Sequence, residues 1–207
     1  MTRTRGSLDE QHHAKRAALV ESMIARLALS GATKPSLRQL AESAGVSVAT
    51  LRHYFRDRDG IIEAVLKEWN RRGEGFLALA AQPDDKLHES LHGYLRMFVA
   101  ANRDFGFAGI VAVGLVEGLL HETHGPAFLD AALDPMLGAL EQRLAGHAAR
   151  GELKAGTDLR LAALSLLGPL FLSCLHQMQL FGAARCKLNL DHQINHQVEA
   201  FVAAFAK

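Results

Sequence analysis

The sequence predicts an all-α protein. Apolar residues recur at spacings of three and four along almost the whole chain, and the alternation of Val, Ile and Thr that is typical of strands is missing. Gly and Pro interrupt the pattern where helices would end. At 207 residues and 49% hydrophobic, the chain is long enough for one good core and a small satellite domain.

The first helix is expected from about residue 10 to residue 30. Val20, Ile24 and Leu27 fall on one face of it, and Gly31 can end it. We expect this helix to pack on the two short helices that follow.

The most informative segment comes next. Residues 36–55, SLRQLAESAGVSVATLRHYF, read as a helix, a four-residue turn and a second helix. Ser36 and Gln39 fit a capping box, Gly45 stands where the reversal needs a positive φ, and Ser47 can cap the second helix. This is the unit that lays its second helix in a DNA major groove.

The charge distribution agrees with a DNA-binding role for this segment. Residues 1–60 hold ten Lys/Arg and six Asp/Glu, a net charge of +4, whereas residues 61–207 hold thirteen and sixteen, a net charge of −3. A basic module on a mildly acidic body is typical of a nucleic-acid-binding domain joined to another domain. We therefore predict a helix-turn-helix DNA-binding domain at residues 1–60 and a helical ligand-binding and dimerisation domain at residues 61–207.

The second domain is expected to consist of helices separated by turns. Asp57 or Asp59 can cap a helix that leaves the basic module and enters the body. Breaks are predicted at residues 82–85, 124–126 and 134–135, and a loop at residues 151–156. The later helices are an amphipathic one over residues 87–98, an apolar one over 105–120, one ending near 150, a nearly all-round apolar one from 158 to about 181, and an amphipathic one from about 191 to 206.

The last two helices indicate self-assembly. Each carries an excess of apolar residues on one face, which suits an antiparallel pair that meets its own copy in a four-helix bundle. Internal core packing of a monomer is the alternative. The candidate dimerisation residues are Leu164, Phe171, Leu175, Ile194, Val198, Phe201 and Phe205.

The order of these parts resembles the TetR/AcrR family of transcriptional regulators. The family's usual run, A-G-V-S-x-G-T-L-Y-x-H-F-x-S-K-E-x-L, is met here by AGVSVATLRHYFRDRDGI. Arg58 holds the place of the family's lysine, while Arg52 and Tyr54 stand where tyrosine and histidine are usual and Ala49 replaces a glycine. The outright matches are Ala44, Gly45, Val46, Ser47, Thr50, Leu51 and Phe55.

The resemblance implies roles for individual residues. Thr50 and Arg58 would contact DNA phosphate, the start of the second helix of the unit would face bases, and Arg38 would reach into the groove. Arg52 can hold a phosphate or read guanine, so its presence is expected to change the operator sequence and leave binding intact. The full candidate set is Ser36, Arg38, Ser47, Val48, Ala49, Thr50, Arg52, His53, Tyr54 and Arg58.

The resemblance also implies a ligand-responsive regulator, most often a repressor. A small apolar or amphipathic effector would enter the body, move the connecting helix and release a near-palindromic operator in double-stranded DNA. Glycines in the 105–120 helix either open a cavity or let neighbouring helices approach closely. The candidate ligand-binding residues are Phe98, Phe105 and Phe171, with Tyr94, Glu117 and His121 as polar tips.

The sequence offers three alternatives to this interpretation. The pairs His88/His92 and His192/His196 have a spacing that can chelate a divalent ion, which would make the regulator metal-responsive. A helical enzyme with a structural N-terminal hairpin is disfavoured, because no Gly-rich phosphate loop or GxSxG elbow is present. HETH at residues 121–124 fails as a zinc-protease motif because its histidines are three apart. We expect no catalytic residues, bound metal or cofactor.

Two features predict a cytoplasmic protein with no membrane partner. The two cysteines have no paired or metal-ligand spacing, which fits a reducing compartment. The first residues lack an apolar core of the signal-peptide type, and the longest apolar run is shorter than a membrane span.

Overall fold

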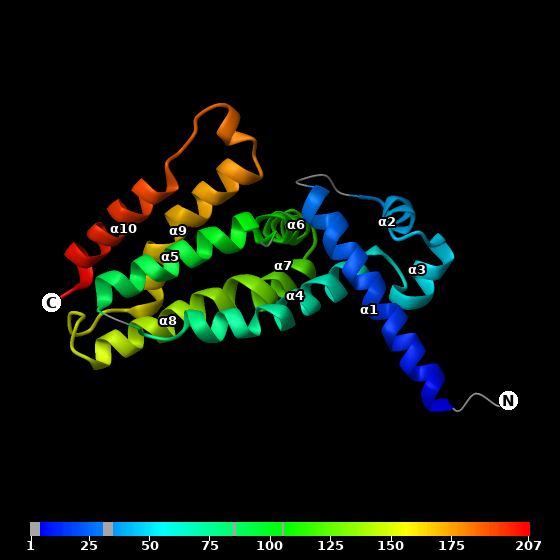
Figure 1. Cartoon of the computed structure of the whole chain (residues 1–207), viewed down its shortest axis with the longest axis horizontal. Helices are drawn as coiled ribbons and strands as arrows, with labels where there is room; N and C mark the ends of the chain where they lie inside the picture. Colours follow the sequence, from blue (N-terminus) through cyan, green and yellow to red (C-terminus); the bar gives the residue numbers. More distant parts are fainter. Residues whose placement is uncertain (1–4, 31–34, 85, 105) are drawn as a thin grey trace.

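The computed structural model describes residues 5–30, 35–84, 86–104 and 106–207, and within these ranges it contains helices and no strand beyond one isolated bridge between Leu153 and Ala206. The all-α prediction is confirmed. Figure 1 shows a small helical head at one end of an elongated helical body. The head consists of α1 (Arg5–Ser30), α2 (Leu37–Ser43) and α3 (Val48–Phe55).

The body is formed by seven α-helices of the described chain. α4 leaves the head and runs along the body beside α8, and α5, α9 and α10 pack together on the other side (Figure 1). The bounds of these helices are α4 (Arg58–Ala80), α5 (Leu87–Asp104), α6 (Phe107–Leu120), α7 (His124–Phe128), α8 (Asp134–Ala149), α9 (Leu159–Met178) and α10 (Leu190–Phe205).

Side-chain caps fix the helix starts of the head, as the sequence predicted. The Ser36 backbone N–H donates to Gln39 Oε1 at 2.8 Å, and the Gln39 N–H donates to Ser36 Oγ at 3.3 Å, which completes the capping box. Gly45 adopts φ +62° in the turn, and Ser47 Oγ accepts the Thr50 N–H at 3.0 Å. Asp57 caps α4 by accepting the Gly60 N–H at 2.9 Å. The two short helices are therefore held in one relative orientation.

The core of the head continues into the body. Leu27, Leu40, Leu51 and Ile61 are fully buried together, and the same cluster includes Ile110 of α6. α6 thus forms one wall of the head. The domain boundary predicted at residue 60 falls inside α4 and stays a prediction.

The chain does not break at residues 134–135. A π-helical turn, Leu129–Leu133, joins α7 directly to α8, and Pro135 lies in the first turn of α8, inside this continuous helical segment. The predicted break is therefore wrong. Continuity of α7 with α8 ties the end of α6 firmly to the body.

The glycines of α6 allow close packing. A Cβ on Gly114 would stand 2.1 Å from the Phe128 ring, and a Cβ on Gly118 would stand 3.1 Å from Gly125 Cα. Of the two outcomes left open by the sequence, the structure shows close approach of neighbouring backbone and rings at these positions.

The apolar stripe of α10 faces its own chain. Ile194, Val198 and Phe201 are buried against α5 and α9, and Phe205 packs at the edge of the same core. This burial corresponds to the internal packing that the sequence left as the alternative, although Phe205 keeps part of its side chain exposed. The role of these residues as dimer contacts stays a prediction.

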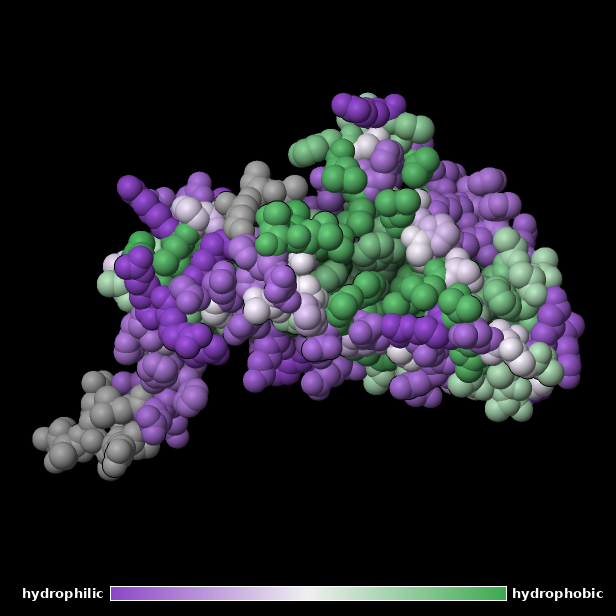
Figure 2. All heavy atoms as spheres, turned by 180° about the vertical axis from the view of Figure 1, so that it is seen from behind, coloured by the Kyte–Doolittle hydropathy of each residue, from purple (hydrophilic) through white to green (hydrophobic). Residues whose placement is uncertain are grey.

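α9 has a second apolar face that no other residue in the described part of the chain covers. By length and composition alone α9 could cross a membrane, and 33% of its apolar window is buried. Ala162, Leu166 and Leu170 fill the core, while Leu161 and Leu172 are 63% and 64% exposed. α9 passes behind α5 in Figure 1, and Figure 2, seen from behind, shows apolar side chains gathered over the middle of the body.

Candidate nucleic-acid interface and internal cavity

α3 presents one stripe of its surface to solvent. Ala49 is exposed, as are Arg52 and His53, which follow it by three and four residues, whereas Leu51 and Phe55 on the opposite face are buried. Arg56, the residue that follows the helix, is also exposed and has φ +66°. A small residue followed by cationic and hydrogen-bonding side chains can approach base edges and reach the flanking phosphates. The stripe has the composition of a nucleic-acid contact.

The other predicted residues of α3 are partly buried. Val48 packs against the head core, and Thr50 Oγ1 lies 2.9 Å from Ser47 Oγ at the helix start. Tyr54 stacks on His12 of α1 with ring centroids 4.7 Å apart. These side chains therefore also brace α3 against the rest of the head.

α2 contributes one cation to the same end of the molecule. Arg38 is highly exposed and donates to Glu42 Oε1 at 2.9 Å within the helix. Exposed pairs of this kind contribute little to stability, so the guanidinium can exchange its partner for a phosphate at small cost. Ser36, beside it, is exposed but uses its hydroxyl in the capping box.

Arg58 is not placed as a free surface cation. Its Nη1 and Nη2 donate to the two carboxylate oxygens of Glu117 at 2.8 and 2.6 Å, and its Nε donates to the Pro35 carbonyl at 3.0 Å. The side chains are 15% and 2% exposed. Arg58 thus links the start of α4, the entry to α2 and the end of α6, and a phosphate contact would require it to leave Glu117.

A partly open cavity of about 450 Å³ lies in the body next to α4. Its wall is largely aromatic and apolar, with Asn70 and Arg72 as polar groups. Arg72 pairs with Glu68 at 2.9 Å and with Glu21 of α1, so the cavity wall is connected to the head. The lining residues are Trp69, Asn70, Arg72, Gly73, Phe76, Leu77, Phe98, Ala101, Phe107, Ala131, Ala132 and Met136.

Most of the predicted ligand-binding residues lie elsewhere. Phe98 lines the cavity, but the Tyr94 hydroxyl is buried and donates to the Met136 carbonyl at 3.2 Å. Glu117 and His121 lie at the junction with the head, and Phe171 packs between the two cores. Phe105 lies outside the described residues.

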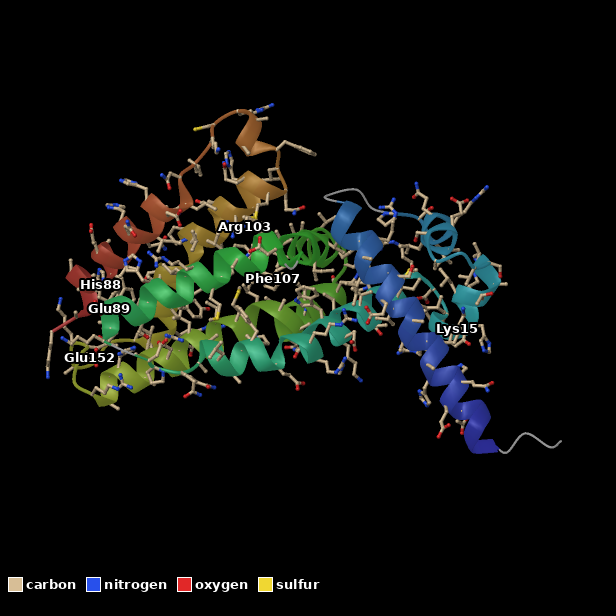
Figure 3. The ribbon with its side chains drawn as sticks, in the orientation of Figure 1. Lys15, His88, Glu89, Arg103, Phe107 and Glu152 are labelled. Carbon is tan, nitrogen blue, oxygen red and sulfur yellow. The ribbon has the colours of Figure 1, made fainter. Side chains whose placement is uncertain are left out.

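The sequence interpretation missed the α4 side of the cavity. Trp69, Gly73 and Phe76 recur at spacings of four and three on one face of α4, beyond the part that fills the head core. This periodicity was the available signal. Figure 3 shows Phe107 in the middle of the molecule, between the head and the far end of the body.

A chain of hydrogen bonds at the end of the body away from the head resembles a catalytic triad, but it is buried and closed to substrate. Ser90 Oγ lies 2.9 Å from His147 Nε2, and His147 Nδ1 lies 3.2 Å from Glu152 Oε2. Ser90 is 1% exposed, and its Oγ also accepts from buried Arg143 at 2.6 Å. A nucleophile needs access to substrate. The cluster therefore serves to hold α5 and α8 together.

The two histidine pairs do not assemble a metal site of their own. His88 and His92 have ring centroids 4.7 Å apart, and Figure 3 shows His88 at the end of α5 far from the head. Among the described residues, neither this pair nor His192/His196 gathers a third ligand group within bonding range.

Comparison with known proteins gives one family match. The sequence model of "Bacterial regulatory proteins, tetR family" matches residues 27–65, which include α2 and α3. The chain is also similar to the HTH-type transcriptional regulator BetI of Cronobacter sakazakii, at 24% identity over 132 residues, or 62% of this chain and 58% of that protein. The chain thus spans less than two thirds of that curated relative's length.

Solved structures resemble the whole fold. A protein of Mesorhizobium loti, described as a TetR-family transcriptional regulator, superposes with a TM-score of 0.75 at 21% identity, covering 99% of this chain and all of that one. FadR of Bacillus subtilis, in complex with stearoyl-CoA, superposes with a TM-score of 0.70 at 19% identity, covering 90% of this chain and 97% of that one. At these identities the likeness concerns the fold.

Proposed function

Since the chain belongs to the TetR family of bacterial regulatory proteins, we propose that it is a dimeric DNA-binding transcriptional regulator. It acts as a repressor that leaves a near-palindromic operator when a small apolar or amphipathic effector fills the cavity. It is not an enzyme.

The exposed stripe of α3 carries this proposal. Ala49, Arg52 and His53 face solvent on a helix whose start is capped by Ser47, and exposed Arg56 follows the end of that helix. A rigid, short helix with this face fits a major groove, and two such helices about 34 Å apart read the two halves of a palindrome.

DNA binding is tested by selecting duplexes from a random-sequence pool with the purified full-length protein. Affinity for a selected duplex is then measured by fluorescence anisotropy over a range of salt concentrations. We expect a specific site with inverted-repeat symmetry and a steep fall of log affinity with log salt. Failure to select any sequence, or salt-insensitive binding, would refute the proposal.

The cavity supports an effector with a large apolar part. Four aromatic side chains, those of Trp69, Phe76, Phe98 and Phe107, line it. Arg72 offers a cation to an acidic group, and an effector that took Arg72 from Glu21 would loosen α1 from α4. The fold neighbour FadR was solved with stearoyl-CoA, which has both an apolar chain and anionic groups.

A thermal-shift series tests the effector class. Palmitate, stearoyl-CoA and the uncharged hexadecanol are added to the purified protein, and each is then tested for release of the selected duplex. A ligand at a hundred times its dissociation constant stabilises the fold by about 2.7 kcal/mol. We expect stabilisation by the anionic compounds, and an equal response to hexadecanol would refute the role of Arg72.

The dimer is proposed to form through the exposed face of α9. Leu161, Leu164 and Leu172 lie on it, and Gly168 between them permits close approach of a second copy of this chain. Light scattering should give a dimer for the wild type and a folded monomer for Leu161→Glu/Leu172→Glu. Leu79→Glu, at an equally exposed site on α4, should remain dimeric.

A further inference from the structure

Three side chains meet where α6 turns into α7. Glu117 lies in the last turn of α6, His121 follows its end, and His124 is the first residue of α7. The backbones of Gly118 and Gly125 approach so closely that a Cβ on Gly118 would stand 3.1 Å from Gly125 Cα. The corner therefore folds His124 back beside Glu117.

The ligand-type atoms of these side chains converge. Glu117 Oε2 lies 3.8 Å from His124 Nδ1 and 4.0 Å from His121 Nε2, and one such atom from each residue lies within 4.8 Å of the others. Around a zinc ion, ligand atoms at about 2.0–2.1 Å from the metal would stand about 3.3 Å apart. Small rotations of the three side chains would close the gap, and half-exposed His121 leaves the ion a route from solvent.

His124 gives an independent reason to expect a ligand. It is 1% exposed, yet neither of its ring nitrogens has a hydrogen-bond partner in the part of the chain that the structure describes. Burying an unsatisfied polar group costs free energy that a metal bond would restore. Its Nε2 lies 3.8 Å from Asp59 Oδ1, so a metal on Nδ1 would leave Nε2–H to donate toward a carboxylate, the outer arrangement that orients metal-bound histidines.

We propose that Glu117, His121 and His124 form a site for a divalent transition-metal ion, Zn²⁺ in the first place, at the junction of head and body. Two imidazoles and one carboxylate, with a fourth position for water, form a donor set that zinc accepts. Mg²⁺ and Ca²⁺ prefer oxygen ligands and are disfavoured. The site is distinct from the histidine pairs of α5 and α10.

The metal would act on DNA binding through Arg58. The carboxylate oxygen nearest both imidazoles, Glu117 Oε2, is the one that accepts from Arg58 Nη1 at 2.8 Å. Coordination would replace that hydrogen bond and neutralise the charge that holds Arg58, which frees the guanidinium toward phosphate. The ion also adds positive charge near the head, so both effects strengthen DNA binding. This regulatory step, unlike the metal site itself, rests on the proposed function.

Metal binding is tested by titrating untagged, chelator-treated full-length protein with ZnCl₂ in a calorimeter, with Co²⁺ absorption as a report of coordination. We expect one saturable equivalent and the visible bands of tetrahedral Co²⁺. His121→Ala should weaken binding by well over tenfold, and its side chain is exposed enough for the variant to fold, as circular dichroism will verify. Asp59→Asn should weaken binding about tenfold. His88→Ala is the matched control and should bind as the wild type does.

The remaining outcomes separate the metal site from its effect on DNA binding. Absence of saturable zinc binding, or full binding by folded His121→Ala, overturns the site. The selected duplex should bind more tightly with zinc than without it, and His121→Ala should abolish that difference. Zinc binding without any gain in DNA affinity overturns the coupling. Zinc binding by a protein that selects no DNA overturns the proposed function and leaves the site standing.

Discussion

The ion pair between Arg58 and Glu117 should make a large contribution to folding when it is broken on one side only. In Arg58→Met the Glu117 carboxylate, 2% exposed, loses the two charged hydrogen bonds that Arg58 donates. Removing one partner of a buried pair costs about 3–5 kcal/mol. Because Arg58 keeps 15% of its side chain exposed, we expect the lower end, about 3 kcal/mol.

Urea unfolding followed by the fluorescence of Trp69 measures this cost, since Trp69 is the one tryptophan of the chain. With a slope of about 2–3 kcal/mol/M, the midpoint should fall by about 1 M. Arg71→Met is the matched control, because Arg71 pairs with Glu68 on the surface of the same helix. That exposed pair should contribute less than about 1 kcal/mol.

The double variant Arg58→Met/Glu117→Leu completes the cycle. It removes the buried charge together with its partner, and we expect it to regain most of the stability lost by Arg58→Met. Two results would refute the view that Glu117 needs a positive partner in this structure. One is a loss of unfolding free energy below about 1 kcal/mol in Arg58→Met. The other is a double variant that loses as much stability as the two single variants added together.

Three other predictions concern the DNA surface, the cavity and the distal cluster. Arg52→Ala should lower affinity for the selected duplex and reduce the salt slope by about 0.9 in anisotropy titrations, whereas exposed Arg96→Ala on the body should not. Ala101→Trp, which places an indole ring in the cavity, should keep DNA binding and weaken both effector stabilisation and effector release. Burial lowers the pKa of His147 below its ordinary 6.5, so His147 takes up a proton at a higher pH in the unfolded chain than in the folded one. The urea midpoint should therefore fall as the pH drops below about 6.5. His147→Asn should weaken this fall, and exposed His192→Asn should leave it as it is.

The head could be predicted in detail because its signals are local. A capping box, a glycine with positive φ and a serine cap each act within four residues, so Ser36, Gly45 and Ser47 behave as the sequence indicates. Local signals also gave most of the helix ends of the body. They failed at Pro135, because a proline that starts a helix and one that breaks a chain look alike in sequence.

Contacts between distant helices could not be predicted in the same way. The apolar stripe of α10 indicated burial, yet nothing local tells whether Val198 packs on its own α5 or on a second chain. The pairing of Arg58 with Glu117 joins residues 59 positions apart. The cavity depends on gaps among four segments, so its lining could not be read from one helix at a time.

The shared core of α1–α4 and α6 has a consequence for protein engineering. Leu27, Leu40 and Leu51 are buried in one cluster with Ile110, so a fragment ending at residue 60 would expose apolar surface to water. Fusing the head to the body of another protein would then require α6 to be included in the fusion. The portable unit is discontinuous in sequence, and its two pieces must be transplanted together.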